Sequence, residues 1–365
     1  MSSAESNPLT VIAKAAPQLA AVDAARVARE HWGLEASCTE LVSERDQNFR
    51  LQTADGRRYV LKIANSAEDP VVTDFQVRAL LHIERYLAIR AAPISAPQIV
   101  RDLAHQTQVM LQIDGVQYVA RIVSYLEGVP LADTCINGTL CRNLGVFLAH
   151  LGLALEDFAH PGSKHALLWD MQQALNLREL LSDIADKEVR GRVAQSLDDF
   201  EHLALPRLPS LRAQVIHNDF NPENVLIEAG NATAVAGIID FGDMLHAPLI
   251  VDVAVAASYL RVLDGNPLAQ IAEFLAGYHA VNRLAAAEID ILFELIQARL
   301  CTTIAILCWR ASTKGANDPY LQNAAAVESS ADEFLRRLME IPPENARRIF
   351  REVCASVDTG ARGNH

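Results

Sequence analysis

Residues 215–224 read Val-Ile-His-Asn-Asp-Phe-Asn-Pro-Glu-Asn, and residues 238–243 read Ile-Ile-Asp-Phe-Gly-Asp. The stretch between them, residues 225–239, contains two apolar runs on either side of a Gly-Asn pair, a pattern that predicts a β-hairpin. Such a hairpin would carry Asn224 and Asp240 to the same rim on neighbouring strands. The two polar motifs and the hairpin that joins them therefore predict a single functional site that contains residues of both motifs.

Both motifs have the spacing found in kinases. His-x-Asp-x-x-x-x-Asn is typical of a kinase catalytic loop, and Asp-Phe-Gly is typical of the strand that binds the metal ion. Phosphoryl transfer depends on in-line positioning and on positive charge near the phosphate oxygens. We therefore expect Asp219 to be the catalytic residue that orients the attacking hydroxyl, and Asn224 and Asp240 to bind Mg²⁺ through oxygen atoms. If His217 and Asp219 were ordinary loop residues and Asp240 only capped a turn, the order of the two motifs would stay unexplained.

The composition limits the class of protein. A chain of 365 residues is long enough for two lobes with separate cores. The formal net charge of −13 argues against a nucleic-acid partner, whereas a nucleotide needs only a local positive pocket. The six cysteines form no Cys-x-x-Cys pair, so we expect reduced thiols and a cytoplasmic protein. Neither a signal peptide nor an apolar run of about eighteen residues is evident, so no membrane partner is expected.

The hydrophobic pattern predicts an α+β class with a two-lobed, protein-kinase-like fold. The N-lobe, residues 1–124, would be β-rich with an antiparallel sheet, and the C-lobe, residues 125–365, would be rich in helices. In the N-lobe we expect a helix within residues 9–32, hairpins at 49–63 and 109–124, and a helix from Asp69 to about Arg90. In the C-lobe we expect helices over 140–158, 168–183, 187–205, 252–263, 267–281, 286–311, 318–340 and 343–356, with residues 359–365 frayed.

Lys62 is the candidate for the lysine that binds phosphate. It lies in the middle of a predicted strand, and alternation would point its side chain away from the apolar neighbours, into the cleft between the lobes. A solvated strand face is the alternative. The ion-pair partner of Lys62 would come from the following helix, where Asp74, Gln76 and Glu84 all remain open.

The loop expected to cover the phosphates is unusual. Residues 43–49 read Ser-Glu-Arg-Asp-Gln-Asn-Phe and lack the glycines of a protein-kinase phosphate loop, so we expect the side chains of Gln47 and Asn48 to assist. A surface β-turn is the alternative. Residues 124–128 occupy the place of a hinge, where backbone groups near Ser124 and Leu126 would bind the edge of an adenine or guanine base.

These motifs, together with Tyr-Leu-Glu-Gly at 125–128, resemble the aminoglycoside phosphotransferase-like kinases, which include choline, homoserine, methylthioribose and hydroxylysine kinases. Residues 19–34, 44–49 and 60–65 look most like the hydroxylysine kinase branch. The protein-kinase arginine after the catalytic-loop histidine is absent here, as is usual for small-molecule kinases. The resemblance implies transfer of the γ-phosphoryl of ATP or GTP, with Mg²⁺, to the hydroxyl of a small amine-bearing molecule. It also implies a structural role for His217, in a monomer or homodimer.

The residues that would bind the acceptor are predicted from the chemistry of its charged groups. A cationic amine would need carboxylates or aromatic faces near Asp219, and a carboxylate on the acceptor would need an arginine. We favour Asp243 as the substrate-binding residue because the motif fixes it beside the metal site. Further candidates, each with an alternative role in packing, capping or ion pairing, are Trp169, Asp170, Tyr278, Glu294 and Arg299. An antibiotic phosphotransferase and a catalytically silent nucleotide-binding module are the alternative functions.

Overall fold

The structure is a computed structural model that describes residues 17–43, 45–314, 321 and 324–362. It divides into two compact units. Unit 1 contains the described residues up to Ala91, together with Ala96–Glu127 and Ala159–Leu168; unit 2 contains Ala92–Ser95, Gly128–Phe158 and the described residues from Trp169 onward. The predicted class is confirmed, because an antiparallel sheet forms the N-terminal part and helices dominate the C-terminal part. The domain boundary after residue 124 stays a prediction.

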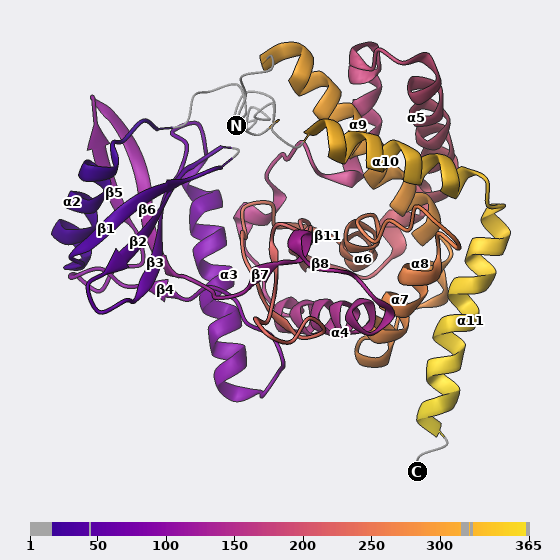
Figure 1. Ribbon diagram of the computed structural model, residues 1–365, viewed down its shortest axis with the longest axis horizontal. Helices are drawn as coiled ribbons and strands as arrows, with labels where there is room; N and C mark the ends of the chain where they lie inside the picture. Colours follow the sequence, from indigo (N-terminus) through magenta and orange to yellow (C-terminus); the bar gives the residue numbers. More distant parts are fainter. Residues whose placement is uncertain (1–16, 44, 315–320, 322–323, 363–365) are drawn as a thin grey trace. The chain divides into compact units, whose positions relative to one another are not determined.

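Unit 1 is built on one antiparallel sheet, shown with its helices in Figure 1. Its strands are β1 (Ala36–Leu41), β2 (Gln47–Thr53), β3 (Arg58–Ile63), β4 (Ile99–Val100), β5 (Val109–Ile113) and β6 (Val116–Ser124). The order is β1-β2-β3-β6-β4, and β5 also pairs with β6. The two predicted hairpins are therefore confirmed, whereas β1 was not predicted. Its sequence, Ala-Ser-Cys-Thr-Glu-Leu, forms a sheet edge with little buried surface, so the apolar alternation that marks a strand is weak.

The two faces of this sheet differ in chemistry. Helix α2 (Ala21–Trp32) packs on one face, where it forms an apolar core with Leu61 and Ile63 of β3. Side chains alternate along a strand, so Lys62 lies on the opposite face, as predicted. On that face Arg121 of β6 donates a hydrogen bond to Gln76 of helix α3 (Pro70–Ile89). The polar face of the sheet therefore carries two cationic side chains, Lys62 and Arg121.

Helix boundaries in unit 1 follow local signals. Asp69 caps α3 by accepting a hydrogen bond from the Val71 N–H, and Pro70 occupies the first helical position, as expected. Gly33 ends α2 in the left-handed region with φ 67°. The helix expected within residues 9–32 is Ala21–Trp32, and residues 9–16 and Glu44 of the predicted phosphate loop lie outside the described residues.

Unit 2 is dominated by helices, with three short strand pairings. The helices are α4 (Gly138–Leu155), α5 (Lys187–Asp199), α6 (Leu249–Ala257), α7 (Ala269–Val281), α8 (Ala286–Ile289), α9 (Leu292–Lys314), α10 (Ala324–Met339) and α11 (Pro343–Arg362). Helices α4 and α7 lie side by side in Figure 1 and approach closely at two glycines. A Cβ on Gly145 would lie 2.0 Å from the Phe274 carbonyl oxygen, and one on Gly277 would lie 1.9 Å from that of Arg142. Only glycine permits this crossing.

Several predicted helices were shifted. The helix predicted at 252–263 begins at Leu249, directly after Pro248, and ends at Ala257. Residues 168–183 form a kinked 3₁₀ segment, Met171–Asp183, and the helix predicted at 187–205 leaves α-geometry after Asp199. Helix α11 continues to Arg362, so fraying from 359 was wrong as far as that residue. Residues 318–320, 322–323 and 363–365 lie outside the described residues.

Two helices are long and apolar enough to cross a membrane by length and composition alone. They are Gly138–Leu155 and a window of α9, Leu292–Thr313. Of these windows, 56% and 89% are buried inside the structure. Such burial is what packing in a protein core produces, and α9 forms the centre around which α5, α6 and α10 pack.

Candidate active site

The predicted hairpin brings the two motifs together. Strand β9 (Val225–Ile227) pairs antiparallel with β10 (Val235–Ile238), with Ile238 opposite Val225. One residue beyond this pair, the Ile239 N–H donates to the Asn224 carbonyl oxygen at 2.9 Å. Asn224, directly before β9, and Asp240, two residues after β10, therefore lie at the same end of the hairpin. This part of the prediction is confirmed.

The loop before the hairpin is held by Asp252 on α6. Its carboxylate accepts the backbone N–H of His217 at 3.2 Å and that of Asn218 at 2.8 Å. These two bonds satisfy backbone donors that are buried and would otherwise be costly to leave unpaired. Burial raises the pKa of Asp252 to about 6, although both hydrogen bonds act in the opposite direction. Asp252 thus fixes the path of the chain into Asp219.

His217 is a core residue of this loop. Its ring is fully buried and meets Phe241 edge-on, with the ring centroids 4.8 Å apart. Burial lowers the pKa of His217 to about 4, so the imidazole is neutral near pH 7. Its Nδ1 accepts the Asp219 N–H at 3.3 Å. A neutral ring that packs behind the loop and accepts from its backbone supports the structural role over a catalytic one.

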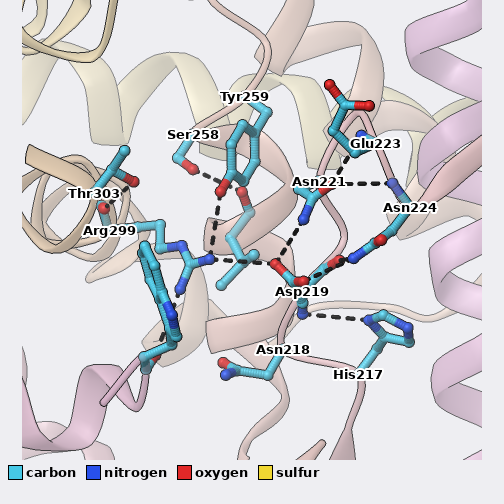
Figure 2. Close-up of polar contacts among 12 residues, drawn as sticks. His217, Asn218, Asp219, Asn221, Glu223, Asn224, Ser258, Tyr259, Arg299 and Thr303 are labelled. Atoms are coloured by element: carbon cyan, nitrogen blue, oxygen red, sulfur yellow. Dashed lines mark hydrogen bonds and ion pairs between the residues drawn. The ribbon is translucent and has the colours of Figure 1, made fainter. Parts of the chain in front are cut away.

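The Asp219 carboxylate lies at the centre of a polar network (Figure 2). Asn224 Nδ2 donates to Oδ2 at 2.7 Å, and Asn221 Nδ2 donates to Oδ1 at 2.9 Å. Arg299, from α9, places its guanidinium 3.5 Å from Oδ1. Burial and then the neighbouring Asp243 raise the pKa of Asp219 to about 7, against the opposing effect of Arg299. A carboxyl group with a pKa close to neutrality suits proton transfer from an attacking hydroxyl.

Two backbone positions in these motifs are unusual. Asn218 has φ 62° and Asp240 has φ 57°, which place non-glycine residues in the left-handed region. Asn and Asp tolerate this conformation better than other residues, and such positions cluster at functional sites. Asp240 is exposed, and its Oδ1 accepts the Gly242 N–H at 3.2 Å. The turn therefore presents a carboxylate to solvent at the end of the hairpin.

The residues at this end of the hairpin fit a hard divalent cation. No group of three or more His, Cys, Asp or Glu side chains that could hold a metal occurs among the described residues. Mg²⁺ does not need such a cluster, because it is usually bound by one or two protein oxygens, waters and phosphates. Asn224 uses its amide nitrogen on Asp219, which leaves its amide oxygen for a cation, and Asp240 offers an exposed carboxylate. These two oxygens are the donor set such an ion would find.

In unit 1, Lys62 lies between two cross-strand neighbours. The register pairs Lys62 with Asn48 of β2 and with Arg121 of β6. Asn48 is buried, and its Oδ1 has no hydrogen-bond partner among the described residues. Of the candidate partners for Lys62, Gln76 accepts from Arg121, and Asp74 contacts Arg78 and His160. Glu84 is exposed. Arg121 is a buried cation beside Lys62 that sequence reasoning missed.

The other residues predicted to bind the nucleotide differ in the hydrogen bonds that they already make. The Gln47 amide bonds Glu40 and both backbone groups of Leu19, so this side chain ties the N-terminal segment to the sheet. The Ser124 N–H and hydroxyl are both used by the backbone of Gln98. Leu126 is half-buried and follows the last paired residue of the strand. This arrangement disfavours the Gln47 side chain and the Ser124 N–H as nucleotide contacts.

Most of the further substrate candidates have structural roles. Asp170 caps the segment that follows it, Glu294 pairs with Arg347, and Tyr278 is buried in the core. Asp243 is buried and acts on the pKa of Asp219, which places its charge near the Asp219 carboxylate.

Arg299 and Trp169 are the exceptions, because the guanidinium of Arg299 stacks on Trp169 and lies beside Asp219. The sequence did not indicate the roles of Asn221 and Asp252. Asn221 stands inside the motif and could have been found there. Asp252 carries no local signal, because the contact joins residues 34 apart.

Comparison with known proteins places the chain in a family. A family model described as the phosphotransferase enzyme family matches residues 37–289. Hydroxylysine kinase of Mus musculus is 26% identical over 371 residues, covering 95% of this chain and 96% of the relative. The hydroxylysine kinase of Danio rerio is 25% identical over 347 residues, covering 91% of this chain and 95% of the relative.

Solved structures share the fold at lower identity. An amicoumacin kinase in complex with AMP-PNP, Ca²⁺ and Ami aligns with a TM-score of 0.62 at 15% identity, covering 87% of this chain and 93% of that chain. A microcompartment-associated aminopropanol kinase aligns with a TM-score of 0.60 at 16% identity, covering 87% and 96%. At these identities the likeness shows the fold alone.

The matched region spans more than half of the chain, so the chain belongs to the phosphotransferase enzyme family. It is a phosphotransferase with the kinase-like fold that its motifs predict. The resemblance to aminoglycoside phosphotransferase-like kinases, and within them most to hydroxylysine kinases, is confirmed.

Proposed function

We propose that this phosphotransferase moves the γ-phosphoryl group of ATP or GTP to the hydroxyl of a small amine-bearing metabolite, with hydroxylysine as the first candidate. The observation that carries the proposal is the convergence of Asp219 and Asn224, joined by a 2.7 Å hydrogen bond, with Asp240 just beyond the end of the neighbouring strand β10. This arrangement supplies one carboxylate for the acceptor and two oxygen ligands for a cation. The full-length likeness to hydroxylysine kinases supports the choice of acceptor.

Each role in the proposal follows from the chemistry of a group. Asp219 accepts a hydrogen bond from the acceptor hydroxyl and turns its oxygen toward the phosphorus. Asn224 and Asp240 would hold Mg²⁺, which when bound supplies positive charge to the phosphate oxygens. Lys62 contributes a further positive charge to the phosphates. Leu126 offers backbone groups to the base.

We propose that the amine of the acceptor binds near the carboxyl groups that surround Asp219. Asp243 is buried and shifts the pKa of Asp219 upward, so two carboxyl groups share this part of unit 2. An ammonium group on the acceptor would be attracted by this negative charge. The proposal therefore predicts that amine-bearing acceptors bind better than neutral alcohols of the same size.

A panel of acceptors tests the function. The full chain is incubated with Mg-ATP or Mg-GTP and, separately, with 5-hydroxylysine, homoserine, choline, aminopropanol, an aminoglycoside or a macrolide. Formation of the phosphorylated acceptor is followed by mass spectrometry. The proposal predicts the fastest transfer to an amine-bearing hydroxy compound of metabolite size. Transfer to an antibiotic alone would favour resistance, and nucleotide binding without any transfer would favour a silent module.

A further inference from the structure

Arg299 is a fully buried charged residue next to the catalytic carboxylate. It lies on α9, and only 1% of its side chain is exposed. Its guanidinium NH2 lies 3.5 Å from Asp219 Oδ1, and Figure 2 shows the two groups facing each other. Burying a charged side chain costs free energy unless the charge is paired. The position of Arg299 in a core helix therefore requires a partner of opposite charge.

Aromatic residues fix the plane of the guanidinium. The ring centroid of Trp169 lies 4.7 Å from the guanidinium carbon of Arg299, and that of Tyr259 lies 6.0 Å from it. Arg299 also donates to the Trp169 carbonyl oxygen at 3.5 Å and to the Tyr259 hydroxyl at 3.4 Å. Its Nε is buried without a hydrogen-bond partner among the described residues. These neutral groups orient the side chain, and its charge acts on the nearby carboxylates Asp219, Asp243 and Asp252, of which Asp219 forms the ion pair.

The two oxygens of Asp219 are therefore used unequally. Oδ1 accepts a hydrogen bond from Asn221 at 2.9 Å and forms an ion pair with the guanidinium of Arg299 at 3.5 Å, whereas Oδ2 accepts a hydrogen bond from the side-chain amide of Asn224 at 2.7 Å. An ionised carboxylate offers about two acceptor positions on each oxygen. Among the described residues, Oδ2 thus keeps one position open for a further donor, whereas the second position of Oδ1 faces the guanidinium of Arg299.

We propose that Arg299 is a positioning residue for the transfer reaction: it holds Oδ1 of Asp219 so that Oδ2 receives the acceptor hydroxyl. The proposal rests on the proposed function, because it assigns the oxygen through which that function works. Trp169 and Tyr259 serve it by keeping the guanidinium in one plane. Arg299 itself does not touch the substrate, since it is covered by these residues.

Kinetics of four variants test the proposal in the full chain with Mg-ATP and 5-hydroxylysine. Arg299→Met should lower kcat on the order of a hundredfold while the KM values for ATP and 5-hydroxylysine stay within a factor of about three. Arg299→Lys keeps the charge without the planar fork, so it should recover on the order of tenfold of the loss. In the Asp219→Asn background, Arg299→Met should lower kcat by less than about threefold more, because Arg299 acts through that carboxylate.

Arg347→Met is the matched control for removing an arginine that contacts α9. Arg347, on α11, pairs with Glu294 of α9, the helix that also carries Arg299. This pair lies outside the Asp219 network. Its loss should lower the melting temperature and leave kcat within about twofold of wild type. A similar fall in kcat for both arginine variants would mean that Arg299 only supports folding, which overturns the proposal.

Two further results separate the proposal from its rivals. A selective rise in the KM for 5-hydroxylysine in Arg299→Met, with kcat retained, would make Arg299 a binding group for the acceptor carboxylate and overturn the positioning role. If wild type phosphorylates no acceptor, the proposed function fails, and melting temperatures then test the contact itself. Arg299→Met should lower the melting temperature less in Asp219→Asn than in wild type; equal shifts in both backgrounds overturn the proposal.

Discussion

The buried imidazole of His217 makes a quantitative prediction about stability and pH. The pKa of this group falls from an ordinary 6.5 to about 4 in the folded protein because the ring is fully buried. Between these two values the unfolded chain binds a proton that the folded chain refuses, so stability falls as the pH is lowered from about 6.5 to 4. At about 1.4 kcal/mol per pKa unit, the loss from this one residue amounts to about 3 kcal/mol.

Asp252 acts in the opposite direction over nearly the same range. Its pKa is raised from 3.8 to about 6, so the folded protein binds a proton that the unfolded chain does not. The contribution of Asp252 to stability therefore decreases as the pH rises from about 4 to 6, again by about 3 kcal/mol. The two effects largely offset each other in wild type, and the His217 effect appears only in a difference between variants.

His217→Asn isolates the effect. Asparagine keeps an acceptor near the position of Nδ1, which receives the Asp219 N–H, but it cannot titrate. Urea unfolding followed by circular dichroism at pH values from 4 to 8 gives the free energy of unfolding of both proteins. The value for wild type minus that for the variant should fall by about 3 kcal/mol between pH 7 and pH 4. His105→Asn, at an exposed position with φ 61°, controls for the substitution itself.

Parallel curves for wild type and His217→Asn would refute the reasoning. They would mean that the folded protein accommodates the imidazolium, which a ring packed on Phe241 without access to solvent cannot do. An increase of the difference toward low pH would indicate a charged histidine paired with a carboxylate. Either result would reopen a catalytic role for His217.

Two further predictions concern the crossing of α4 with α7 and the Asp219 network. Gly277→Ala should lower the free energy of unfolding, measured in urea, by about 1–3 kcal/mol because its Cβ would meet the Arg142 carbonyl. Gly191→Ala in α5, with open space around it, is the control and should raise that free energy by up to about 1 kcal/mol. Similar effects of both substitutions would contradict the close crossing. Asn224→Asp should lower kcat on the order of a hundredfold or more in the acceptor assay, because a second carboxylate would face Asp219 Oδ2 where an amide now donates at 2.7 Å; activity near wild type would argue against this network.

The sequence predicted those features that depend on neighbours along the chain. The hairpin at 225–239 follows from two apolar runs and a turn, and it alone brings Asn224 beside Asp240. Alternation in β3 placed Lys62 opposite Leu61 and Ile63 in the same way. Short-range patterns of this kind are complete within a few residues, so no knowledge of the fold is needed to interpret them.

The remaining features depend on contacts that the sequence does not display. Arg299 reaches Asp219 from a distant helix, and nothing around it in α9 distinguishes it from a residue that holds the helix. Gln47 stands where a phosphate contact was expected, yet its amide binds Leu19 and Glu40. Both side chains could serve either role chemically, and only the tertiary structure decides which groups they meet.

Comparison of Asp219→Asn with Asp240→Asn tests the central claim most directly. Transfer to 5-hydroxylysine and calorimetric binding of Mg-ATP are measured for both variants and for wild type. Asp219→Asn should lose transfer on the order of a hundredfold or more and bind Mg-ATP as wild type does, whereas Asp240→Asn should bind Mg-ATP distinctly more weakly. Full transfer by Asp219→Asn, or unchanged Mg-ATP affinity in Asp240→Asn, would contradict the assignment of these two carboxylates.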